Sequence, residues 1–128
     1  MALIVLDASV VIAHLDASDA LHAAAVAALR EHVEDDLHLP ASAYAEALVA
    51  PARTGRLEEG RRTIAALGAR LVPIDAEVAE RAAAVRAAEP ALRLPDALVL
   101  ACGDVLDAQA VVTADRRWQR FERVELIG

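Results

Sequence analysis

The 128-residue chain contains no lysine, because all 13 of its basic residues are arginines. Any mechanism that depends on a catalytic or phosphate-binding lysine is therefore excluded. The P-loop nucleotide-binding motif is excluded directly, since the pattern Gly-x-x-x-x-Gly-Lys does not occur.

Cysteine and long apolar runs are also scarce. The single cysteine, Cys102, cannot form an intramolecular disulfide and suits a reducing compartment. It lies in the apolar stretch LVLACG, which predicts a buried, unreactive thiol.

No apolar run approaches the roughly 20 residues that cross a bilayer. The N-terminal run ends at Asp7 without a preceding basic residue, so we expect no signal peptide, no membrane contact and a cytoplasmic location.

Apolar and acidic residues are abundant instead. Hydrophobic residues make up 57% of the chain and the mean hydropathy is +0.36, which argues against disorder. Alanine supplies about a quarter of the residues and favours helices. The length suits a single domain over residues 1–128.

The net charge of −7 argues against a nucleic acid partner, because phosphate binding usually needs a basic surface. A cation bound by clustered carboxylates would change this inference, because the cation offsets their charge and itself attracts phosphate.

Hydrophobic periodicity predicts strands alternating with helices. The expected strands are 2–6, 37–39, 70–74, 109–113 and 124–127, with Pro73 placing the third at an end or edge. The expected helices are 9–16, 19–33, one from Ser42, 57–67, Asp75 to Pro90, Leu94 to about 106, and a short one from Asp115. This order indicates an α/β fold with a central parallel sheet and helices on both faces.

Local signals set the expected helix boundaries. Ser18, Ser42 and Asp75 are predicted to cap the helices that follow them. Pro51 and Gly55 are predicted to mark a break after the third helix.

Four carboxylates occupy positions that suit a shared site. Asp7 directly follows the first strand and Asp115 follows the fourth, so both are expected at the strand ends where such folds bind ligands. Asp96 lies in the first turn of a helix, and Glu46 lies about one turn into another. Taken singly, the three aspartates are explained as helix caps and Glu46 as a solvated residue. Together they can converge on one crevice.

Carboxylates that converge would repel one another, and a divalent cation would remove that cost. Ligation by oxygen alone suits Mg²⁺ or Mn²⁺. Histidine ligation of zinc is not expected, because the four histidines lack metal-type spacing; they are His14, His22, His32 and His38. Of these, only His38 falls in a predicted strand.

These motifs resemble the PIN-domain family, and specifically the VapC toxins of bacterial toxin–antitoxin pairs. The resemblance runs the whole length through LDAS, YAEAL, LPDALVLA and VVTADRRW, of which the last two are the most specific. It implies a PIN-like fold in which the four acids hold one or two metal ions and Ser9 and Thr113 are supporting hydroxyls. It also implies an endoribonuclease that leaves a 5′-phosphate, a homodimer, and a cognate VapB-like antitoxin as partner.

Two arginine clusters are candidates for contact with the RNA backbone. One comprises Arg53, Arg56, Arg61 and Arg62, and the other Arg116, Arg117 and Arg120. The second directly follows Asp115 and is therefore the favoured RNA-binding cluster. Asp104 departs from the acid pattern. It lies about 12 Å along the helix from Asp96, so it is expected to be exposed and out of reach of the metal.

The main alternative is a PIN-like fold that binds RNA or protein without cleaving it. The presence of all four acids favours the enzyme. A receiver-type signalling domain and a haloacid-dehalogenase-type phosphatase both need a lysine, and the phosphatase also needs an Asp-x-Asp where this chain has Asp7-Ala8-Ser9.

Overall fold

The structure, a computed structural model, describes all 128 residues and contains one five-stranded sheet. The strands lie in the order β3-β2-β1-β4-β5, and every neighbouring pair is parallel. Their bounds are Leu3–Leu6 for β1, Asp36–Pro40 for β2, Arg70–Val72 for β3, Ala110–Thr113 for β4 and Val124–Leu126 for β5. The predicted parallel α/β sheet is confirmed, and β3 is an edge strand that ends before Pro73.

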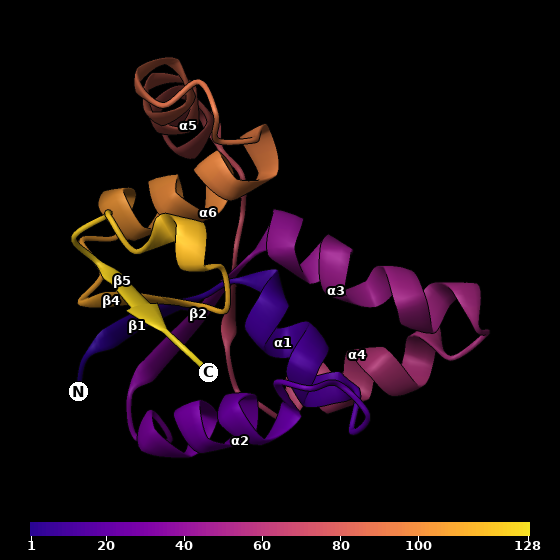
Figure 1. Cartoon of the computed structure of the whole chain (residues 1–128). Helices are drawn as coiled ribbons and strands as arrows, with labels where there is room; N and C mark the ends of the chain where they lie inside the picture. The colour runs from indigo at the N-terminus through magenta and orange to yellow at the C-terminus, as the bar shows by residue number, and fades with distance from the viewer.

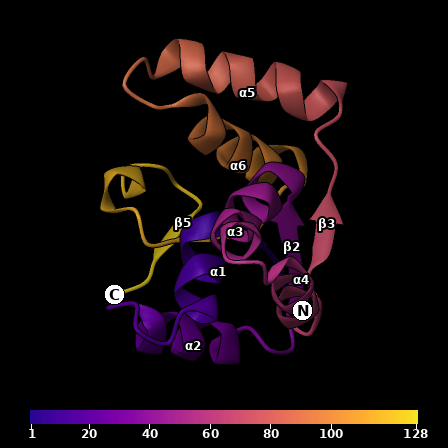
Figure 2. The same cartoon turned by 90° about the vertical axis from the view of Figure 1, so that its right-hand side faces the viewer.

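Helices cover both faces of this sheet. Their bounds are Ala8–Leu15 for α1, His22–Glu31 for α2, Ala41–Arg53 for α3, Leu57–Ala65 for α4, Ala76–Ala88 for α5, Leu94–Val105 for α6, and Arg116–Trp118 for the 3₁₀ turn η1. Helices α5 and α6 lie on one side of the sheet, and α1 and α2 lie on the other (Figure 1). Helices α3 and α4 extend beyond the edge where β1 runs into α1 (Figures 1 and 2). None of the helices combines the length and apolarity that a bilayer span requires.

The central strands are buried on both faces, as the continuous apolar run at the N-terminus predicts. Ile4, Val5 and Leu6 of β1 are at most 1% exposed, and Val111 and Val112 of β4 are fully buried. The core is one continuous cluster of buried side chains from every layer. Strand ends that emerge from such a core hold their side chains in fixed positions.

Two predicted caps are wrong. Helix α2 begins at His22, not after Ser18, because Asp16 and Asp19 shape the preceding loop: Ser18 donates to Asp16, and the amide of Leu21 donates to Asp19. Helix α3 begins at Ala41, one residue before Ser42, whose hydroxyl has no hydrogen-bond partner. The predicted cap at Asp75 is confirmed, since its carboxylate accepts from the amide of Val78.

The predicted break at Pro51 is also wrong. Pro51 lies inside α3, which continues to Arg53. Pro51 lies near the C-terminal end of the helix, where its missing N–H removes one helical hydrogen bond. The chain turns at Gly55, whose φ of +69° is readily adopted only by glycine.

Candidate metal site

The strand order creates a crevice between β1 and β4. From β1 the chain moves outward through β2 to β3, and it then crosses to β4 on the other side of β1. In open α/β sheets, ligands bind at the carboxyl ends of the two strands where the order reverses. Asp7 directly follows β1, and its amide donates to the Val112 carbonyl of β4 at 2.9 Å. Thr113 is the last residue of β4.

The side chain of Asp7 is held by hydroxyl groups from both strand ends. Its Oδ2 accepts from Ser9 Oγ at 2.7 Å and from Thr113 Oγ1 at 2.8 Å. Asp7 occupies the N-cap position of α1, yet its carboxylate makes no capping bond. It is 8% exposed, and Oδ1 accepts no hydrogen bond from the protein. The geometry leaves one carboxylate oxygen free at a strand end while the other is fixed.

Ser9 and Thr113 also fix the loop that follows β4. Ser9 Oγ accepts from the amide of Ala114 at 3.0 Å, and Thr113 Oγ1 accepts from the amide of Asp115 at 3.1 Å. Thr113 is completely buried. These two hydroxyls therefore tie the position of Asp115 to that of Asp7, although the residues are far apart in the chain.

Glu46 and Asp96 face the same crevice. Glu46 is exposed overall, but partial burial of its carboxyl group raises its pKa, and the charges of Asp7 and Asp96 raise it further. Burial likewise raises the pKa of Asp96; Arg93 opposes this shift, while Asp7 and Asp115 add to it. The charges of Asp7 and Asp115 at the strand ends therefore act on Asp96 in the first turn of α6.

Two arginines already pair with acids of this group. Arg117 holds both carboxylate oxygens of Asp115, at 3.0 Å and 2.7 Å, and this bond lowers the pKa of Asp115. Arg93 Nε lies 3.9 Å from Asp96 Oδ2. Arg93 was not among the site residues expected from the sequence, although its position three residues before Asp96 was a detectable signal.

The four predicted acids thus lie at the same edge of the sheet, but their side chains do not surround a common point as the ligands of one metal ion would. No three histidine, cysteine, aspartate or glutamate side chains stand together as a group able to hold a metal ion. The chemistry of the donors nevertheless suits Mg²⁺ or Mn²⁺, because they supply only oxygen atoms and their mutual repulsion falls when a cation is bound.

The four histidines do not belong to the acid group, and each has contacts elsewhere in the structure. The rings of His14 and His22 stack with centroids 6.4 Å apart, and His22 Nδ1 lies 2.7 Å from the Ala13 carbonyl. His38 Nε2 lies 3.1 Å from Asp36 Oδ2 without the alignment of a hydrogen bond. His32 bridges Asp35 and Glu125, each at 2.8 Å.

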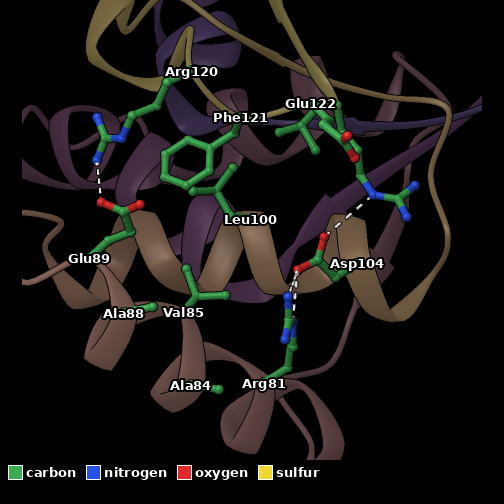
Figure 3. Close-up of a pocket in the computed structure, with 12 residues that line it drawn as sticks. Arg81, Ala84, Val85, Ala88, Glu89, Leu100, Asp104, Arg120, Phe121 and Glu122 are labelled. Atoms are coloured by element: carbon green, nitrogen blue, oxygen red, sulfur yellow. Dashed lines mark hydrogen bonds and ion pairs between the residues drawn. The ribbon is translucent and has the colours of Figure 1, made fainter.

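The favoured arginine cluster is engaged within the protein. Arg116 donates to the Gly128 carbonyl, and Arg117 holds Asp115. Arg120 pairs with Glu89 at 3.0 Å and lies over the ring of Phe121 (Figure 3).

Asp104 differs from its predicted exposed state. It is half-buried between Arg81, at 2.8 Å, and Arg123, at 3.4 Å, beside a pocket formed by α5, α6 and the loop before β5 (Figure 3). Its burial follows from these two ion pairs, whose partners are distant in the sequence.

Comparison with known families agrees with this architecture. A sequence model described as the PIN domain matches residues 4–124. The chain belongs to the PIN-domain family. Within this PIN domain, all four acids and both hydroxyls fall inside the matched range. A search of curated proteins returned no significant match.

Solved structures share the fold of this PIN domain at low sequence identity. A toxin–antitoxin complex from Klebsiella pneumoniae is 22% identical, with a TM-score of 0.77 and coverage of 94% of each chain. The sarcin–ricin-loop-cleaving toxin VapC20 of Mycobacterium tuberculosis is 18% identical, with a TM-score of 0.79 and coverage of 98% of this chain and 99% of that one. FitAcB from Neisseria gonorrhoeae is 23% identical, with a TM-score of 0.72 and coverage of 88% and 87%. These similarities establish a VapC-like fold.

Proposed function

We propose that this PIN domain is a metal-dependent endoribonuclease and the toxin of a VapBC-type toxin–antitoxin pair. The observation that supports the proposal is that Asp7 and Asp115 follow the neighbouring strands β1 and β4, and that the charge of Asp7 acts on both Glu46 and Asp96. Repulsion among these acids lowers the stability of the metal-free protein. Clusters of like charges that destabilise the fold in this way are typical of functional sites.

Each residue of the site has a separate role in the proposed hydrolysis of the phosphodiester bond. A bound Mg²⁺ or Mn²⁺ would supply a water of lowered pKa and positive charge beside the scissile phosphate. Asp7 presents its free Oδ1 while Ser9 and Thr113 prevent its rotation. Glu46 and Asp96 are the candidates to accept a proton from the attacking water. The expected products carry a 5′-phosphate and a 3′-hydroxyl.

The partners follow from the same family. The structural neighbours include toxin–antitoxin complexes, which supports a VapB-like antitoxin for this chain. We further propose that residues 1–128 act as one domain, as a homodimer and in the cytoplasm. Light scattering of the purified chain, alone and with its antitoxin, tests the assembly.

Cleavage of RNA tests the enzyme. The purified protein should cut single-stranded RNA with Mn²⁺ or Mg²⁺, lose activity in EDTA, and regain it when the metal is restored. Asp96→Asn should reduce cleavage at least about 1000-fold while circular dichroism stays unchanged, because a ligand is lost. Asp104→Asn, a change of the same kind on the same helix, is the matched control. A folded Asp96→Asn protein with full activity would refute the proposal.

The open arrangement of the acids favours one second candidate. Because no three of them form a closed ligand set, the fold could bind RNA without cleaving it. RNA binding that is unaffected by metal, EDTA and Asp96→Asn, together with absent cleavage, would establish this binding module instead.

A further inference from the structure

Beside the carboxylates lies a pocket of about 400 Å³ between α1 and α3. Its walls include Ile12 from α1 and Val49 and Pro51 from α3, and the first two are 39% and 45% exposed. The volume falls within the range of about 300–1,000 Å³ found for ligand pockets. Exposed apolar side chains around a cavity of this size are suited to a flat, apolar group.

One acid of the proposed active site, Glu46 of α3, lines this pocket. Along α3, Arg53 follows Glu46 by seven residues, which is two helical turns and about 10 Å. The pocket wall therefore runs from the reacting edge toward an arginine on the same helix.

The other end carries unpaired positive charge. Arg53 and Arg56 line the pocket, and neither guanidinium forms an ion pair or a hydrogen bond with the protein. Arg117 and Arg120, in the cluster that the sequence favoured, are held by Asp115 and Glu89. The chain has a net charge of −7, so two unpaired arginines beside one cavity indicate a place where an anionic group can bind.

We propose that this pocket is the RNA subsite next to the scissile phosphate. An unstacked nucleobase lies against Ile12, Val49 and Pro51, and a neighbouring phosphate pairs with Arg53 and Arg56. Asp16 also lines the pocket, and its carboxylate would accept from a base amino group but repel a phosphate. The base therefore lies on the α1 side and the phosphate at the end of α3. The inference rests on the proposed function and names its substrate contacts.

An RNA strand explains these features better than a peptide does. Single-stranded RNA is recognised through splayed bases held on apolar or aromatic surfaces, with arginines on the backbone. The pocket combines both and adjoins Glu46, where a substrate strand must pass.

Binding without cleavage tests the subsite. In an Asp96→Asn background, fluorescence anisotropy measures the affinity for labelled 12-nucleotide single-stranded RNA of random sequence at several salt concentrations. Arg53→Gln/Arg56→Gln should weaken binding about 10–100-fold and reduce the slope of log K against log salt by about 1–2. Arg86→Gln removes an exposed, unpaired arginine from α5, away from the pocket, and should change affinity less than about 2-fold.

A second measurement probes the base. Ala50, exposed on the pocket wall, is replaced by Phe to fill the cavity, and RNA affinity should fall about 10-fold while Mn²⁺ affinity is unchanged. If both variants bind RNA as tightly as their parent, the pocket serves another partner, such as a peptide, and the proposal is overturned. Absence of cleavage by the unmodified protein would instead overturn the proposed function, whatever the binding results.

Discussion

Asp7 illustrates how single hydroxyl groups organise the site. Its carboxylate would be free to rotate at a strand end, yet Ser9 and Thr113 both donate to the same oxygen. The buried Thr113 also accepts from the Asp115 amide, so one side chain fixes two acids.

Thr113→Val keeps the shape of the side chain and removes these bonds. The free energy of unfolding should fall by about 1–3 kcal/mol, because Asp7 loses a buried donor and the Asp115 amide loses its acceptor. Mn²⁺ affinity and cleavage should fall about 10–100-fold. Thr63→Val, which removes an exposed hydroxyl bonded within its own helix, is the control. Equal losses in both variants would assign Thr113 no special part in the site.

Asp96→Asn should also make the metal-free protein more stable. The pKa of Asp96 is raised in the folded state by burial and by Asp7 and Asp115. Its charged form is therefore disfavoured by folding at neutral pH, and a neutral amide removes that cost. Calorimetry in EDTA should show a higher Tm than that of the unmodified protein, and a clearly lower Tm would contradict the repulsion.

At the scale of elements, the close approach of α6 to the sheet positions Asp96. A Cβ atom on Gly103 would lie 2.6 Å from Val111 Cγ2, so only glycine allows this contact between α6 and β4. Gly103→Ala should cost about 1–3 kcal/mol of unfolding free energy through overpacking. Denaturant titration should show partial rescue by Val111→Ala, which removes the clashing methyl group. Strictly additive losses in the double variant would rule out the contact as the cause.

His32 ties the end of α2 to β5. Burial alone lowers the pKa of His32, but Glu125 and Asp35 outweigh burial and raise it. A raised folded-state pKa stabilises the protein fully below the unfolded-state value of about 6.5, and the gain disappears as pH rises through the folded-state pKa. The Tm difference between the unmodified protein and His32→Gln should therefore shrink as pH rises above about 6.5. A difference independent of pH would contradict this.

The elements could largely be predicted from the sequence, whereas their ends could not. Apolar runs and helical spacing identify every strand and helix, because burial dictates those patterns. The predictions based on Ser18, Ser42 and Pro51 were wrong for local reasons. Ser18 forms a hydrogen bond with Asp16 instead of capping a helix. Helix α3 begins before Ser42 and continues past Pro51, which is tolerated near the end of the helix. The direction of α6 depends on tertiary packing, which no local pattern encodes. The Arg117–Asp115 pair, in contrast, joins residues only two positions apart.

At the scale of the whole molecule, the parallel order β3-β2-β1-β4-β5 brings acids from four segments to one edge. That placement could be predicted, since strand ends and helix starts share an edge in this fold. The charge balance of the acids could be predicted only in part. Arg93 precedes Asp96 by three residues and Arg117 follows Asp115 by two, but this spacing does not encode the rotamers that pair them.

Titration calorimetry of Mn²⁺ into the metal-free protein tests the central claim that these acids serve one ion. Asp7→Asn, Glu46→Gln, Asp96→Asn and Asp115→Asn should each weaken binding at least about 10-fold, whereas Asp104→Asn should bind as the unmodified protein does. Mn²⁺ binding of unchanged affinity in all four variants would show that the acids share an edge but not a metal.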